Sequence, residues 1–208
     1  HITEIADNLA EYLSDDDFFT PFVRLGWFYE GQGLYPLAQP WYEKGKEIAE
    51  QRFGDEYLYI DLFLNNLAIL YYLQGRYEEA EPLYIQALNM FKKLLGKEHP
   101  GVASSLHNLA ILYESQGRYE EAKSLHLQSL DMRKKLLGKE HPDVASSLHN
   151  LAGIYESQER YEEAKPLYIQ ALDMRKKLLG EEHPSVATSL HNLAGLYSSQ
   201  GRYEEAEP

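Results

Sequence analysis

The stretch 99–140, HPGVASSLHNLAILYESQGRYEEAKSLHLQSLDMRKKLLGKE, decides the fold because the 42 residues after it match it at 33 positions. The period extends further: the His-Pro pair at 99 returns at 141 and 183, and the asparagine at 66 returns at 108, 150 and 192. A fixed period of this size is typical of stacked helical arrays, in which each repeat touches only its neighbours. The sequence therefore favours a protein that holds other proteins over an enzyme.

Each repeat predicts two helices joined by a short loop. In residues 99–140, apolar residues at helical spacing predict a first helix from Pro100 to about Gln116, and Gly117 ends it. A second helix is expected to begin at Tyr119, with acidic residues at its positive end and basic residues at its negative end. One such pair cannot bury its apolar face alone, so successive pairs are expected to stack.

Two local features of the repeats have structural interpretations. Glu159 replaces the glycine that ends the first helix in the other repeats. If the left-handed conformation is kept there, we expect a cost of about 1 kcal/mol. The basic triplets at 133–135 and 175–177 are interpreted as favourable charges at helix ends, rather than as a site for nucleic acid or anionic lipid.

The apolar positions form a recognisable motif. It reads Leu106-x2-Leu109-Ala110-x2-Tyr113…Ala122-x3-His126, and then Leu148-x2-Leu151-Ala152-x2-Tyr155…Ala164-x3-Tyr168. These positions resemble the tetratricopeptide repeat (TPR), and the eight residues beyond its usual 34 resemble the kinesin light chain type of TPR. The resemblance covers about residues 15–208. It implies an all-α, right-handed superhelical solenoid of antiparallel helix pairs.

The period divides the chain into units. We expect a divergent first TPR unit at 15–56, full units at 57–98, 99–140 and 141–182, and a truncated unit at 183–208. The first unit lacks the His-Pro start and adds aromatic residues, as terminal repeats are usually atypical. Residues 1–14 predict an amphipathic lead-in helix or a linker from a missing upstream domain. The chain is therefore expected to be a piece of a longer protein.

A second resemblance involves the first unit. Residues 28–35 and 41–43 resemble the unit that follows the nucleotide domain of bacterial NB-ARC ATPases, which are signalling proteins of the STAND class. The resemblance implies an ATPase domain ahead of His1. No Gly-x4-Gly-Lys-Ser/Thr loop occurs in the chain itself, so no phosphate site is expected in it.

Composition excludes several function classes. The chain has no cysteine, no Gly-x-Ser-x-Gly elbow and no His-Glu-x2-His motif, so we expect no enzymatic activity and no cofactor. A net charge of −13 argues against nucleic acid, and no apolar run is long enough to cross a membrane. Without cysteine or a visible signal peptide, we expect a cytoplasmic protein.

Eight histidines raise the question of a metal site. The three before proline, at 99, 141 and 183, are interpreted as loop residues. His107, His149 and His191 repeat on one face of successive first helices, where neighbouring helices are too far apart for two imidazoles to share a zinc ion. We therefore expect no metal but a polar ladder facing the groove, able to make binding sensitive to pH between about 5 and 8.

The TPR resemblance implies that the first helices line a concave groove. Asn66, Asn108, Asn150 and Asn192 match the asparagine that commonly bonds a bound peptide backbone; an inter-repeat hydrogen bond that fixes stacking is the alternative. Apolar contacts are expected at one end of the groove, because later repeats carry glycine or polar residues there. These apolar residues are Trp27, Ile69, Tyr72 and Ile111.

These patterns predict a non-enzymatic scaffold that binds a protein or an extended peptide through the groove. One alternative is the sensor or autoinhibitory TPR arm of a bacterial STAND ATPase, and another is a cargo adaptor like kinesin light chain. Because the repeats are nearly identical and the last one is cut short, the fragment is also expected to be prone to end-to-end or swapped self-association.

Overall fold

The computed structural model describes residues 4–5, 8, 12–14, 17, 19–54, 59–202 and 204. Within these ranges the chain forms nine helices and no strand. In chain order they are α2 Phe19–Glu30, α3 Tyr35–Phe53, α4 Ile60–Leu73, α5 Tyr77–Leu94, α6 Pro100–Ser115, α7 Tyr119–Leu137, α8 Pro142–Ser157, α9 Tyr161–Leu179 and α10 Pro184–Ser199. The expected lead-in helix at 1–14 falls largely outside the described residues, as does most of the chain after 202.

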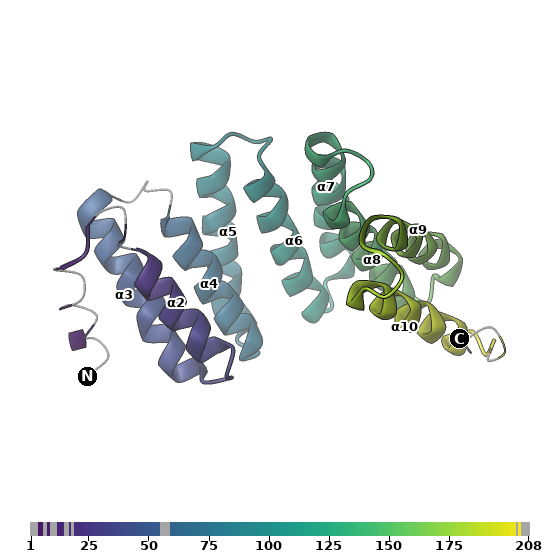
Figure 1. The fold of residues 1–208 in the computed structure, drawn as a ribbon, viewed down its shortest axis with the longest axis horizontal. Helices are drawn as coiled ribbons and strands as arrows, with labels where there is room; N and C mark the ends of the chain where they lie inside the picture. The colour runs from purple at the N-terminus through teal and green to yellow at the C-terminus, as the bar shows by residue number, and fades with distance from the viewer. Residues whose placement is uncertain are drawn as a thin grey trace. The chain divides into compact units, whose positions relative to one another are not determined.

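The helices belong to two compact bodies, His1–Ser105 and Leu106–Pro208, and α6 runs from one into the other. In each body a first helix pairs with the second helix that follows it, as α2 does with α3, α4 with α5, and α8 with α9 (Figure 1). Second helices also pack against the first helix of the next repeat, as in α3 with α4, α7 with α8, and α9 with α10. The all-α architecture of stacked helix pairs is therefore confirmed within each body.

The His-Pro pairs begin the first helices in a way that the sequence did not reveal. The Nδ1 atom of His99 accepts a hydrogen bond from the backbone N–H of Gly101 at 3.0 Å, and His141 and His183 do the same two residues on, each at 3.1 Å. The expectation that these histidines are plain loop residues is corrected, because each side chain caps the N-terminus of a helix and satisfies one of its free N–H groups.

The loops between first and second helices keep one backbone conformation. Gly117 lies in the left-handed region at φ 74°, and Glu159 occupies the same region at φ 60°. Glu159 therefore has the left-handed conformation on which the expected destabilisation depends. In this conformation the side chain is crowded by the backbone. After each of these residues an arginine stacks on the last tyrosine of the first helix, with Arg118 lying 3.7 Å from the centroid of the Tyr113 ring.

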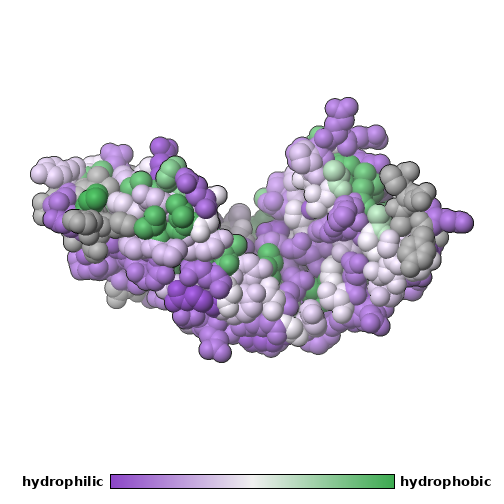
Figure 2. Space-filling model, turned by 90° about the horizontal axis from the view of Figure 1, so that it is seen from below, coloured by the Kyte–Doolittle hydropathy of each residue, from purple (hydrophilic) through white to green (hydrophobic). Residues whose placement is uncertain are grey.

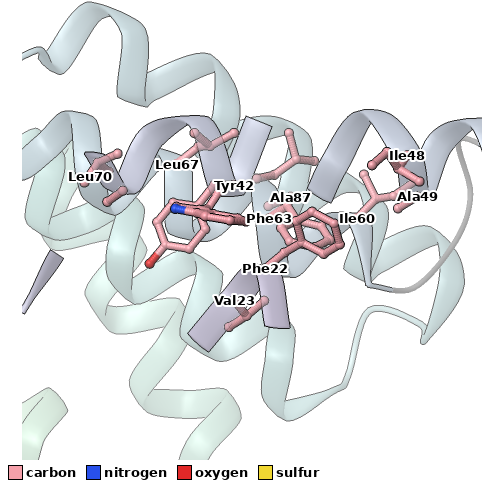
Figure 3. Close-up of a cluster of buried hydrophobic side chains, with 13 residues drawn as sticks. Phe22, Val23, Tyr42, Ile48, Ala49, Ile60, Phe63, Leu67, Leu70 and Ala87 are labelled. Carbon is pink, nitrogen blue, oxygen red and sulfur yellow. The ribbon is translucent and has the colours of Figure 1, made fainter. Parts of the chain in front are cut away.

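The core of the N-terminal body is built from aromatic residues on α2, α3 and α4. Figure 3 shows the side chains of Phe22, Tyr42 and Phe63 gathered in this cluster, and all three are fully buried. Glycine makes room for them: a Cβ atom on Gly26 would overlap the ring of Tyr42, and one on Gly45 would overlap the ring of Phe63. The divergent first repeat thus fills its junction with the second repeat by apolar packing.

The junctions in the C-terminal body contain buried apolar residues as well, but they add a buried polar contact. Nη1 of Arg133 on α7 donates to the hydroxyl of Ser147 on α8 at 2.8 Å and to the backbone carbonyl of Asp143 at 3.2 Å. Arg175 on α9 makes the same contact to Ser189 on α10 at 2.6 Å. Both arginines are buried, so the first member of each triplet also bonds the next helix, a contact that the interpretation as helix-end charges did not include. Burial lowers the pKa of both guanidinium groups.

Among the described helices, none has the length and apolar character that crossing a lipid bilayer would need. The face drawn in Figure 2 is mostly hydrophilic, and its hydrophobic residues gather in small separate patches. Large hydrophobic side chains that reach the surface are therefore local features, and two of them, Trp27 and Phe28, lie on α2.

Candidate partner-binding surface

Trp27 and Asn66 meet between α2 and α4 in the N-terminal body. The Trp27 side chain is 53% exposed, and its indole Nε1 donates to Asn66 Oδ1 at 3.4 Å. Asn66 is only 4% exposed, and its Nδ2 atom is buried without a hydrogen-bond partner. Asn66 thus bonds across two repeats, as in the stacking alternative, but its amide is only half satisfied.

A glutamate follows Trp27 by one turn on the same face of α2. The carboxylate of Glu30 accepts a hydrogen bond from the Tyr42 hydroxyl at 2.8 Å. Burial raises the pKa of Glu30, and this hydrogen bond only partly opposes the effect. The pairing returns in the C-terminal body, where the Tyr168 hydroxyl donates to Glu156 at 2.8 Å.

In the second repeat, Tyr72 stands at the position of Glu30, and the sequence predicts that Tyr72 belongs to the binding surface. Tyr72 is half-buried, and its ring centroid lies 5.7 Å from that of Tyr77. Burial raises the pKa of Tyr84, and the nearby Tyr72 and Glu30 raise it further. Tyr84 therefore interacts electrostatically with both residues. Ile69, one turn before Tyr72 on α4, is half-buried as well.

The histidine ladder of the C-terminal body packs inward more than expected. The ring of His107 meets that of His126 edge-on at 5.3 Å, and the ring of His149 meets that of Tyr168 at 5.2 Å. Burial lowers the pKa of His107 to about 3 and that of His149 to about 4. The expected sensitivity between pH 5 and 8 is therefore wrong for these two residues, whereas His191 is exposed.

In the C-terminal body, the asparagine of the last first helix also bonds a neighbouring repeat. Asn192 Nδ2 lies 2.8 Å from His149 Nε2, so the amide donates to a neutral imidazole across two repeats. Asn108 and Asn150 are half-buried on α6 and α8. Asn192 is therefore held by a neighbouring repeat, as Asn66 is. The role of the four asparagines in binding stays a prediction.

The apolar character of this face changes along the repeats. Ile111 on α6 is half-buried, and the equivalent positions later in the chain are Gly153 and Gly195. The first helices are also poor in positive charge, because they contain no lysine and the single arginine Arg24. Their acidic residues are Glu30, Asp61, Glu114, Asp143 and Glu156. In the part of the chain that the structure describes, no three His, Asp or Glu residues come together as a metal site would need.

Sequence reasoning missed the role of Glu30 and its partner Tyr42. The signal was present, because a tyrosine or histidine follows the equivalent position by twelve residues in four repeats, as 30 and 42, 72 and 84, 114 and 126, and 156 and 168. In the third repeat His126 takes the tyrosine's place, and its Nε2 lies 3.3 Å from a Glu114 oxygen. A comparison of positions across repeats, rather than along one helix, would have found the pair.

Comparisons with known proteins agree with this architecture. The family model described as tetratricopeptide repeat matches residues 17–81, 59–135, 115–177 and 143–208. A comparison with curated protein sequences gives no match. Among solved structures, the nearly identical TPR-like repeats of a Podosopora anserina protein assigned as a kinesin light chain are 30% identical, with a TM-score of 0.77 over 93% of this chain and 92% of that chain.

Two further structures share the fold. BtubC (BKLC) from P. vanneervenii is 24% identical, with a TM-score of 0.82 over 98% of this chain and 82% of that chain. A Rap protein complexed with competence and sporulation factor is 18% identical, with a TM-score of 0.76 over 98% of this chain and 55% of that chain. The chain therefore belongs to the tetratricopeptide repeat family, with repeats of the kinesin light chain-like type.

Proposed function

We propose that this chain is a non-enzymatic scaffold that binds a protein or an extended peptide through the first helices of its repeats. The observation that carries the proposal is the exposure of Trp27, a large aromatic ring left at the surface beside buried polar groups. Tryptophan is enriched among residues that dominate binding energy at protein interfaces. The next first helix, α4, which bonds Trp27 through Asn66, adds the half-buried side chains of Ile69 and Tyr72.

Membership of the TPR family supports this proposal. Arrays of helix pairs present extended surfaces, and their proteins commonly act as scaffolds. A Rap protein with the same fold was solved in complex with competence and sporulation factor, so this fold can hold a partner. The net charge of −13 argues against a nucleic acid as that partner.

A cargo adaptor like kinesin light chain is the second candidate. The 30% identity to the Podosopora anserina repeats favours it, because that similarity extends over 93% of this chain. Both candidates use the same surface, so one experiment addresses both.

Selection of peptides from a random display library, followed by calorimetry on a selected peptide, tests the proposal. Trp27→Ala should weaken binding by about tenfold or more, because it removes an interface aromatic. The matched control is Ile85→Ala, which removes an exposed apolar side chain from the second helix α5 and should leave affinity within about twofold. Selection of no peptide, or equal losses in both folded variants, would contradict the proposal.

A further inference from the structure

In the N-terminal body, one carboxylate and four aromatic residues come from four successive helices. We call them the aromatic-acidic cluster: Trp27 and Glu30 from α2, Tyr42 from α3, Tyr72 from α4 and Tyr84 from α5. The Tyr42 hydroxyl fixes one oxygen of Glu30 at 2.8 Å, and Tyr84 interacts electrostatically with both Glu30 and Tyr72. Two hydrogen bonds therefore define the position of the carboxylate and of the exposed ring, since Trp27 is bonded in turn to Asn66 at 3.4 Å.

The Glu30 carboxylate lacks a positive partner. No lysine or arginine of the described chain forms an ion pair with it, whereas Glu79, Glu121 and Glu163 each pair with the arginine three residues before them, at 2.7 or 2.8 Å. Burial raises the pKa of Glu30 because the charged form loses water without gaining a cation. A positive group placed here would compensate that loss.

The surrounding rings also favour a cation. Tryptophan is the best side chain for binding a positive charge over its ring face, and the Trp27 ring is exposed one turn from Glu30. Next to the Trp27 ring, the buried Nδ2 of Asn66 lacks a hydrogen-bond acceptor. A second polar group at this surface is therefore unsatisfied, besides the Glu30 carboxylate. An arginine or lysine side chain with its backbone carbonyl offers both a cation and an acceptor.

We propose that the aromatic-acidic cluster binds an arginine or lysine side chain of the segment that occupies the first-helix surface. This inference rests on the proposed function and names one chemical requirement of the partner. The cation lies over the Trp27 ring and against the Glu30 carboxylate, with apolar neighbours contacting Ile69 and Tyr72. The partner segment is therefore basic and apolar at this position, which matches the scarcity of positive charge on the first helices.

The chain contains its own control for this proposal. Glu156 accepts the same 2.8 Å hydrogen bond, from Tyr168, but Gly153 stands in the position of Trp27 and Ser198 in that of Tyr72. The C-terminal body thus has the carboxylate and its tyrosine without the exposed rings. It should not bind the cation in the same way.

The test uses the capped amino acid N-acetyl-arginine-N-methylamide as the probe and the two tryptophan indole NMR signals of the nitrogen-15-labelled chain as the readout. We expect a saturable shift of the Trp27 signal, while the signal of buried Trp41 stays in place. The uncharged analogue with citrulline should give no saturable shift. Glu30→Gln should weaken the arginine response by about fivefold or more, and Glu156→Gln should leave it unchanged.

If the unaltered protein gives the same shift of the Trp27 signal with the arginine probe as with its citrulline analogue, the inference is overturned. This comparison does not depend on whether the variants fold. An undiminished response in folded Glu30→Gln would overturn it as well. Display-selected peptides that depend on Trp27 but carry no basic residue would overturn this inference and leave the proposed function intact. Failure to select any peptide counts against both.

Discussion

Both bodies bury apolar residues at their repeat junctions, but they differ at one pair of positions, which is apolar in the N-terminal body and hydrogen-bonded in the C-terminal body. In the N-terminal body Phe63 fills the space that Gly45 leaves open, and in the C-terminal body Ser147 stands in the position of Phe63 and receives the buried Arg133. An intermediate type joins the second and third repeats, where a Cβ atom on Gly101 would lie 2.6 Å from the Phe91 ring. Junction residues thus vary as complementary pairs, because a large side chain on one helix requires a small or hydrogen-bonding one on the next.

The largest effect is expected when the serine of the C-terminal junctions is placed in the α3–α4 junction without an arginine to bond it. Phe63→Ser introduces the residue of the later repeats, but no arginine faces it, since Ala49 stands where Arg133 stands later. The loss of a fully buried ring should lower the free energy of unfolding by about 3–5 kcal/mol. Urea unfolding measures this, with Phe28→Ser as an exposed control that should cost less than about 1 kcal/mol. A loss below about 1 kcal/mol for Phe63→Ser would show that this junction is not apolar in the way described.

A pH-dependent effect is expected at Asp61, which is buried on α4 where later repeats carry Ala103, Ala145 and Ala187. Burial raises the pKa of Asp61 from 3.8 to about 6. Between these values the folded chain holds the proton more tightly than the unfolded chain. The free energy of unfolding therefore falls as the pH rises through this range, and it stays lower above pH 6.

Asp61→Ala removes that loss. The stability advantage of the variant over the natural chain should grow by about 2 kcal/mol between about pH 4 and about pH 7.5, as measured by urea unfolding at both. Asp61→Asn should show the same pH dependence, because it also removes the titrating group. An advantage that does not change with pH would mean that the carboxyl group is better hydrated than its burial implies.

At the junction between the second and third repeats, the phenylalanine–glycine contact can be exchanged for the arginine–serine contact of the later junctions. Gly101→Asp introduces the residue found at 143 and should cost about 1–3 kcal/mol, because its Cβ atom meets the Phe91 ring. Adding Phe91→Arg should recover at least about 1 kcal/mol, since the new arginine can donate to buried Ser105 as Arg133 donates to Ser147. Strict additivity in this double-mutant cycle would refute the pairing of junction residues.

The smallest effect concerns the one loop that departs from its neighbours. Glu159→Gly relieves a non-glycine residue at φ 60° and should raise stability by about 1 kcal/mol, measured as a rise in Tm. The reverse change, Gly117→Glu, should lower stability by a similar amount, because Gly117 has φ 74°. No change in either variant would mean that the loop relaxes out of the left-handed region.

The sequence predicted the features that depend on local chemistry. The first helix of the third repeat starts at Pro100 and the second at Tyr119, as expected from proline, glycine and the spacing of apolar residues. Helix ends are fixed by a few adjacent residues, so one repeat contains all the information needed. The 42-residue period then predicted the stacking and the family, since one helix pair cannot bury its apolar face alone.

The features that were not predicted from the sequence depend on contacts between residues of different helices. Arg133 looks like a helix-end charge until Ser147 on the next helix is placed beside it. His107 looks like a groove residue until the ring of His126 is seen packed against it. The role of Glu30 was not predicted because its partner Tyr42 lies on another helix. Whether a cation lies near the carboxylate also depends on all the helices around it. Side-chain direction across a helix pair decides each case.

The Arg-Ser junction also makes whole repeats interchangeable. Residues 141–182 contribute Ser147 to the junction before them and Arg175 to the junction after them, so this copy carries both halves of the contact. Duplicating or deleting such a copy in frame regenerates an identical contact and needs no compensating mutation. The phenylalanine-glycine junctions lack this property, because their partners differ from one repeat to the next. Repeats joined by Arg-Ser contacts can thus be gained or lost in whole steps of 42 residues, whereas repeats joined through phenylalanine and glycine cannot.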